Sequence, residues 1–243
     1  MKLRLSSERF HSQNDWLDSW HSFSFADHYS PDWTGFGPLR VINDDTIAAG
    51  HGFGMHPHRD MEIVTVMVAG RLTHRDSMGH EEVLNAGEVQ RMSAGTGLVH
   101  SEMNRDASSC RLIQIWIAPR DNNLPPAYEQ KAFAIGREWT ALLDPKGEDG
   151  AMAVEQTVRL WRAQPQPGDR LSIPQTAEGS QIWMQVIDGA IELSSQPEKQ
   201  MRLERGDGVG TERDDPRLAT LIGSESGADI LLFSLNGTEE ASR

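Results

Sequence analysis

Two short clusters in this 243-residue chain have the residue types and the spacing of a metal site. His56 and His58 stand two residues apart, and so do His100 and Glu102. Because alternate side chains of an extended strand point to the same face, each pair can direct both of its donor atoms at one point. Two such strands side by side would supply three imidazole nitrogens and one carboxylate oxygen, which is a complete ligand set for a first-row transition metal.

The distribution of histidine confines this chemistry to the first part of the chain. All nine histidines lie in the first hundred residues, and residues 101–243 contain none, so a second histidine-based site is excluded there. Outside the clusters, we expect His74 either to orient a ligand or to line the pocket, and His51 and His80 to lie in turns or at the surface. Segment 11–28, which also holds four aromatic residues, is expected to pack in the core or to form a lid.

Composition and charge exclude several classes of protein. The chain has 23 Lys and Arg against 36 Asp and Glu, a formal charge of −13, and no basic run, so direct nucleic acid binding has little electrostatic support. The start lacks the apolar stretch of a secretory signal, and no window approaches the roughly 18 apolar residues of a membrane span. We therefore expect a soluble protein of the cytoplasm. The single cysteine, Cys110, excludes intramolecular disulfides, and we expect it to be a small buried hydrophobic residue.

Short apolar runs broken by Gly, Pro and Asp predict an all-β fold class. Examples of the predicted strands are residues 62–69 and 111–118. Many short strands with frequent turn residues are typical of a β-sandwich or barrel. Residues 119–138 hold three prolines and no clear period, so we expect a connector there. We place the boundary between an N-terminal domain of residues 1–130 and a C-terminal domain of residues 131–243.

An internal repeat supports two copies of one β-fold. Residues 68–72 resemble residues 187–191, and residues 84–88 resemble residues 203–207, both at an offset of 119 positions. In each copy an apolar strand meets a glycine turn, a second strand follows, and an L-x-x-G-[DE] turn comes next. The first copy alone keeps a candidate site, because the same offset from the four metal-ligand candidates leads to Gln175, Ala177, Ala219 and Leu221.

Longer motifs surround the candidate ligands. They are HPHRDMEIVT, HRDSMG and MSAGTGLVHSEMN, with DWLDSWHSFSFADHY and GFGPLRVINDD upstream. These motifs closely resemble the pirin family, whose bacterial members include quercetinase-type enzymes. The resemblance is strong from about residue 14 to residue 120 and continues weakly to about residue 235. It implies two cupin (jelly-roll β-sandwich) domains in tandem, of which the N-terminal one binds the metal and the C-terminal one does not.

The same resemblance implies the ligand set and the metal. It assigns His56, His58, His100 and Glu102 as ligands of one Fe(II) ion, although the donor set is also compatible with Mn, Co, Ni or Cu. In many other cupins the carboxylate ligand would fall at Glu62, which we expect here to support the ligands or the structure. Six-coordination would leave two positions open for a substrate and for water or O₂.

The resemblance to quercetinases implies an enzyme, a metal-dependent dioxygenase that cleaves flavonols such as quercetin. Its partners would be a flavonol or a related enediol and O₂, and Glu102 would be the catalytic residue that accepts a proton or a hydrogen bond from the substrate hydroxyl. The alternative is a pirin-like iron-binding redox sensor or regulatory protein that acts through protein partners. Both functions need the same four ligands. A cavity of several hundred cubic ångströms that opens over the metal would favour the enzyme.

Overall fold

The computed structural model describes residues 1–176, 179–196, 199–212 and 220–235. Within these ranges the chain forms strands and three short 3-10 turns, without an α-helix, so the predicted all-β fold class is confirmed. The described residues also hold no helix with the length and apolar character needed to cross a membrane. The strands are β1 (Lys2–Arg4), β2 (Phe10–Gln13), β3 (Leu17–His21), β4 (Leu39–Ile47), β5 (Gly52–His58), β6 (Glu62–Ala69), β7 (Arg71–Asp76), β8 (Glu81–Asn85), β9 (Glu88–Ser93), β10 (Leu98–Met103), β11 (Cys110–Ile117), β12 (Ala127–Ala132), β13 (Thr140–Asp144), β14 (Met152–Ala153), β15 (Val158–Ala163), β16 (Arg170–Leu171), β17 (Gln181–Gln196), β18 (Lys199–Glu204), β19 (Gly208–Glu212) and β20 (Thr220–Leu235). The turns are η1 (Ser6–Glu8), η2 (Pro31–Trp33) and η3 (Glu148–Gly150).

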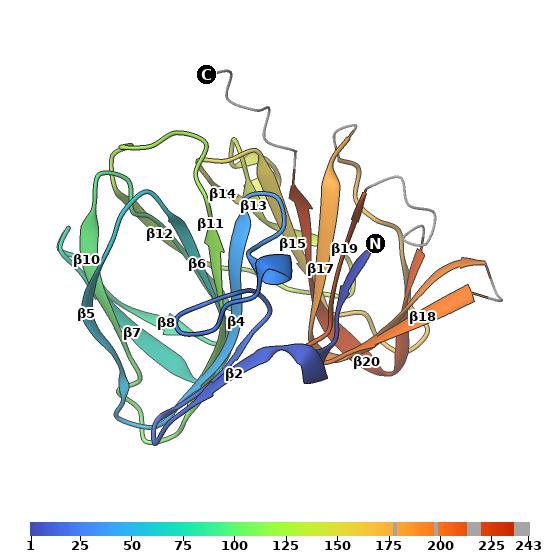
Figure 1. Cartoon of the computed structure of the whole chain (residues 1–243), viewed down its shortest axis with the longest axis horizontal. Coiled ribbons are helices and arrows are strands. Elements are labelled where there is room, and N and C mark those ends of the chain that lie inside the picture. Colours follow the sequence, from blue (N-terminus) through green and yellow to red (C-terminus); the bar gives the residue numbers. More distant parts are fainter. Residues whose placement is uncertain (177–178, 197–198, 213–219, 236–243) are drawn as a thin grey trace.

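The N-terminal half of the molecule is built from two sheets that curl around one interior (Figure 1). The larger sheet has seven strands in the order β12-β9-β6-β11-β4-β3-β2, and the smaller has four in the order β5-β10-β7-β8. Neighbouring strands of both sheets run antiparallel. This is the double-sheet jelly roll that the sequence predicts for a cupin domain.

The central strands β6 and β11 are buried on both faces, which explains their nearly continuous apolar sequences. On one face, Val66 and Ile115 share a core with Leu231 and Phe233 of β20, so the two halves of the molecule meet along this sheet. On the other face, β6 and β11 line the interior of the N-terminal barrel. Full burial of each such aliphatic side chain contributes about 1.5–3 kcal/mol to folding.

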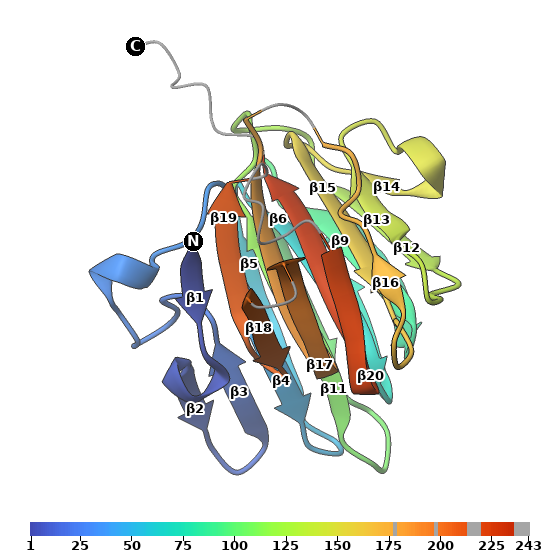
Figure 2. The same cartoon turned by 90° about the vertical axis from the view of Figure 1, so that its right-hand side faces the viewer.

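The C-terminal half is one curled sheet of nine strands. Its main path is β1-β19-β17-β20-β15-β13-β14, with β16 paired to β20 and β18 paired to β17. The long strands β17 and β20 run side by side through it, as Figure 2 shows. The first strand of the chain also joins this sheet, because β1 pairs with β19 through the register Lys2↔Gly210.

The segment predicted as a connector contains one further strand. Residues 127–132 form β12, which pairs with β9 and extends the seven-stranded sheet at its edge. The predicted boundary at residue 130 therefore falls inside a strand of the N-terminal sheet. The division into residues 1–130 and 131–243 stays a prediction.

The glycines of the internal repeat adopt matching backbone conformations. Gly70 and Gly189 have φ of 72° and 70°, and Gly87 and Gly206 have φ of 86° and 87°. These values lie in the left-handed region, where a residue without Cβ carries no steric cost. A Cβ on Gly70 would also lie 2.8 Å from the Cβ of Cys110. The same turn geometry thus recurs in both halves, as expected for two copies of one β-fold.

Candidate metal centre

Three histidines predicted as ligands converge in the interior of the N-terminal barrel. β5 and β10 pair antiparallel with His56 opposite His100, and strand alternation places His58 on the same face as His56. The ring centroids are 4.4 Å apart for His56 and His100, 4.8 Å for His56 and His58, and 4.9 Å for His58 and His100. One nitrogen from each ring lies within 4.8 Å of the other two, a spacing that one ion can bridge.

Glu102 lies beside these three histidines but groups with His100 and His74 instead of with His56 and His58. The pairing of β10 with β5 shifts register between His100 and Glu102. A carboxylate oxygen of Glu102 and one ring nitrogen each of His74 and His100 lie within 4.8 Å of one another. His100 therefore belongs to both groups of donor atoms. The Thr65 hydroxyl donates to one carboxylate oxygen of Glu102 (3.2 Å) and the Gln114 amide donates to the other (2.8 Å). Glu102 therefore reaches the site, and its direct ligation of a metal stays a prediction.

The imidazoles have the protonation state that a metal ligand needs. Burial, together with a smaller effect of neighbouring histidine rings, lowers the pKa of His100 to about 2 and that of His58 to about 4. The rings of His58 and His100 are therefore neutral at physiological pH, and each can offer a nitrogen lone pair. The Nδ1 of His56 lies 2.7 Å from the carbonyl oxygen of Gly54, which fixes its proton there and leaves Nε2 free.

A further observation shows that these residues fit a metal ion. Both ring nitrogens of His100 are buried and have no hydrogen-bond partner among the described residues. A buried polar atom without a partner costs about 1–3 kcal/mol, so a native protein rarely leaves two on one ring. A metal bound at one nitrogen would remove that cost for the atom it binds.

Two carboxyl groups that line the cavity have raised pKa values. Burial raises the pKa of Glu102 to about 7, although its hydrogen bonds with Thr65 and Gln114 act in the opposite direction. Burial also raises the pKa of Asp45 to about 7, against the effect of a hydrogen bond from Ser19. Glu62, where many other cupins place a ligand, is 1% exposed and accepts a hydrogen bond from the Ser93 hydroxyl (2.7 Å). Glu62 does not line the cavity that contains the histidines.

His74 lies behind His100 rather than in the cavity. Its ring is fully buried, and the two centroids are 5.4 Å apart. Its Nε2 lies 3.2 Å from the Asp76 carboxylate, which also contacts Nδ1 of the half-exposed His80 (2.8 Å). Tyr128 stacks on both His74 and His80. Of the two sequence-based alternatives, a residue that orients a ligand fits this position, because His74 does not line the cavity.

The histidines open onto a cavity of about 320 Å³ inside the barrel. Its lining includes His56, His58, His100 and Glu102, the four predicted ligands. The sequence analysis did not assign the other lining residues to the site, and they are Ser12, Leu17, Ser19, His21, Phe25, Ala26, Asn43, Asp45, Phe53, Gln114 and Trp116. Segment 11–28 therefore forms part of the cavity wall.

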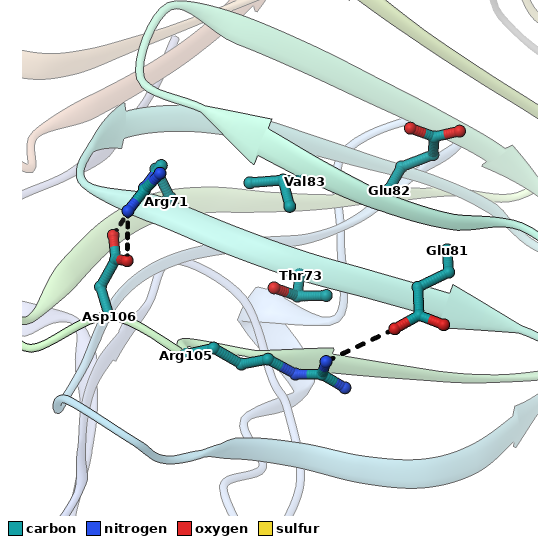
Figure 3. A pocket seen from close by; sticks show the side chains of 7 residues that line it. All are labelled: Arg71, Thr73, Glu81, Glu82, Val83, Arg105 and Asp106. Atoms are coloured by element: carbon teal, nitrogen blue, oxygen red, sulfur yellow. Dashed lines mark hydrogen bonds and ion pairs between the residues drawn. The ribbon is translucent and has the colours of Figure 1, made fainter.

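A second hollow, of about 300 Å³, lies outside the barrel over β7 and β8 (Figure 3). Arg71 pairs with Asp106 (2.5 Å) and Arg105 pairs with Glu81 (3.4 Å), so these charges neutralise one another. The hollow includes no histidine. The interior cavity is therefore the better candidate for chemistry.

Comparisons with known proteins show what the whole chain is similar to. A family model described as Pirin matches residues 3–117, and a model described as quercetinase C-terminal cupin domain matches residues 141–235. A quercetin 2,3-dioxygenase of Escherichia coli (strain K12) is 42% identical over 234 residues, which are 96% of this chain and 97% of that protein. The crystal structure of YhhW from Escherichia coli has a TM-score of 0.89 at 41% identity and covers 98% of both chains. The structure of the bacterial pirin YhhW in complex with nickel(II) has a TM-score of 0.88 at 40% identity and covers 98% of this chain and 99% of that chain.

Proposed function

Because the chain belongs to the pirin family, we propose that it is a metal-dependent dioxygenase that cleaves flavonols such as quercetin. The metal would be held at a mononuclear centre by His56, His58, His100 and Glu102. The observation that carries this proposal is the convergence of three imidazoles on one point of an interior cavity. The name of the similar Escherichia coli enzyme supports the substrate class.

The donor set decides which metals the centre would accept. Fe(II) is our first assignment, and Mn, Co, Ni and Cu fit the same mixture of imidazole and carboxylate. Nickel is the ion bound in the similar pirin structure. When bound, a divalent ion would act as a Lewis acid that lowers the pKa of a substrate hydroxyl and holds the substrate where O₂ can reach it.

In this proposal Glu102 takes the proton from the 3-hydroxyl of a flavonol. Thr65 and Gln114 each contact a different oxygen of its carboxylate, which fixes the group and leaves lone pairs free on both oxygens. A proton acceptor that is already fixed needs no reorganisation when the substrate arrives. Loss of that proton makes the flavonol electron-rich enough to react with O₂.

The apolar part of the cavity would hold the flat rings of the substrate and exclude water. Its side chains are Leu17, Phe25, Phe53 and Trp116. The edge of Trp116 meets the ring of His58, with centroids 4.9 Å apart and an interplanar angle of 83°. Exclusion of water at this point prevents reprotonation of the substrate. In the proposed reaction both atoms of O₂ enter the products, C3 leaves as carbon monoxide, and a depside remains.

The cavity favours the enzyme over the alternative, a redox sensor that acts through protein partners. A volume of about 320 Å³ falls within the range of small-molecule sites, roughly 300–1,000 Å³. A sensor needs only a metal whose oxidation state changes a surface. A chamber with large apolar side chains beside the three histidines is explained by a substrate and not by a sensor.

Anaerobic loading followed by exposure to O₂ tests the proposal. The purified protein is loaded with Fe(II), mixed with quercetin and then exposed to air, while absorbance, oxygen uptake and carbon monoxide are followed. Turnover is expected in the loaded protein, and its loss is expected in His100→Ala. His51→Ala is the matched control, because His51 is exposed in the same domain and does not line the cavity. Unchanged quercetin in the loaded protein, or full activity of His100→Ala, would contradict the proposal.

A further inference from the structure

The cavity has a second polar region that the proposed chemistry does not use. We call it the distal wall, and it consists of Ser12, Ser19, His21, Asn43 and Asp45. These residues come from β2, β3 and β4 of the seven-stranded sheet, whereas the three ligand histidines come from β5 and β10 of the four-stranded sheet. The two sheets enclose the cavity, so the distal wall and the histidines bound it from different sheets.

The distal wall is assembled by strand register. His21 lies directly opposite Asn43, and Ser19 lies directly opposite Asp45, on β3 and β4. Side chains of directly opposed residues point to the same face, which brings these polar groups together on the cavity side. Ser19, Asn43 and Asp45 are each at most 3% exposed. They are therefore polar groups built into the interior of the barrel.

Hydrogen bonds within the distal wall leave two polar atoms free. The Ser19 hydroxyl donates to Oδ1 of Asp45, and Nδ1 of His21 donates to Oδ1 of Asn43 (2.8 Å). The Oδ2 of Asp45 and the Nδ2 of Asn43 have no hydrogen-bond partner in the described part of the chain. Each of these residues has one atom fixed by a neighbour and a second atom available to a ligand in the cavity.

We propose that Asn43 and Asp45 form a subsite that binds the hydroxyl groups on the substrate ring remote from the metal, and so select polyhydroxylated aromatic substrates. This inference rests on the proposed function. A ring that carries two neighbouring hydroxyls would donate a hydrogen bond to Asp45 and accept one from Asn43. The apolar residues between the two polar regions, among them Phe25 and Trp116, would contact the ring faces.

The subsite sets specificity because a ligand without hydroxyls would leave buried polar atoms unpaired. Hydrogen bonds of this kind correspond to a preference of about 10- to 100-fold in kcat/KM. The preference is expected to appear mainly in KM, because the remote ring is bound equally in the ground state and the transition state.

Three flavonols that differ only in the hydroxyls of the pendant ring test the subsite. Quercetin carries two, kaempferol one and galangin none. For the metal-loaded wild type we expect kcat/KM to fall in that order. In Asp45→Leu and Asn43→Leu the ratio of quercetin to galangin should fall toward one through a higher KM for quercetin. Asp45→Asn, which keeps a polar atom in place, should retain most of the preference. Thr46→Ala is the control, because Thr46 is the next residue of β4 and does not line the cavity.

Two outcomes would overturn the subsite. One is a wild type that turns over all three flavonols equally, and the other is an Asp45→Leu variant that loses kcat for all three while the ratio stays intact. If the loaded wild type turns over none of them, the proposed function fails, and the subsite is then tested by binding. Quenching of tryptophan fluorescence should show quercetin bound at least tenfold more tightly than galangin by the wild type and equally by Asp45→Leu. Equal binding of both by the wild type would overturn the subsite alone.

Discussion

Replacement of Glu102 by glutamine separates its role in chemistry from its role in structure. Glu102 is 2% exposed, and its oxygens accept hydrogen bonds from Gln114 (2.8 Å) and Thr65 (3.2 Å). In Glu102→Gln the new amide can still accept from Gln114 through its oxygen and can donate to the hydroxyl oxygen of Thr65. No buried polar atom loses its partner, so the free energy of unfolding should change by no more than about 1 kcal/mol.

The catalytic consequence should be much larger. An amide cannot accept the hydroxyl proton of the substrate, and removal of a positioned general base lowers kcat by about 10²- to 10⁴-fold. This loss corresponds to about 2.7–5.5 kcal/mol of activation free energy. Three imidazoles remain, so the variant should retain part of its metal at reduced affinity.

The assay combines metal analysis, thermal unfolding and quercetin turnover on the same samples. Glu62→Gln is the matched control, because Glu62 is an equally buried glutamate of the same domain whose carboxylate contacts Ser93 and not the cavity. It should keep wild-type metal content and turnover. Intact turnover in Glu102→Gln would refute the role of Glu102 as proton acceptor. Loss of metal in Glu62→Gln would indicate that Glu62 is the carboxylate ligand, as in many other cupins.

Three further predictions concern the metal, one glycine and the cysteine. A chelator should lower the Tm of the protein and added metal should restore it. An ion that binds only the native state adds about 2.7 kcal/mol to the free energy of unfolding at 100 times its Kd. A Tm that changes with neither treatment would contradict binding of a metal to the native state. Gly189→Ala should destabilise the protein by about 1–3 kcal/mol in urea denaturation, because φ is +70° and a Cβ would lie 2.1 Å from the carbonyl oxygen of Gly227. Gly79→Ala has positive φ but open space, so an equal loss there would argue against the steric reason. Burial raises the pKa of the Cys110 thiol to about 11, so the native protein should not react with a thiol reagent at pH 8 until it is unfolded, and rapid labelling would contradict this.

The part of the site that the sequence predicts is the part that depends on local geometry. Because His56 and His58 are two residues apart, their rings lie on one face of a strand. The long apolar runs of β6 and β11 likewise predict buried strands directly. The matched φ of Gly70 and Gly189 shows that the repeat detected by spacing is a repeat of backbone conformation.

The part that the sequence does not predict depends on pairing between distant strands. Asn43 and Asp45 reach the cavity because β4 pairs with β3, a register that their own sequence does not encode. Glu102 lies directly opposite His74 because β10 pairs with β7, and the pairing of β10 with β5 shifts register between His100 and Glu102. No spacing rule anticipates either the long-range pairing or the bulge. Residues 127–132 form an edge strand rather than a connector because they pair with the edge of β9 that β6 does not occupy.

A crystal structure of the metal-loaded protein, with anomalous scattering measured at the absorption edge of the ion, would locate the metal. We expect one peak in the N-terminal barrel, at about 2.0–2.3 Å from one nitrogen each of His56, His58 and His100 and from an oxygen of Glu102. A peak elsewhere, or an ion bound without these histidines, would contradict this expectation.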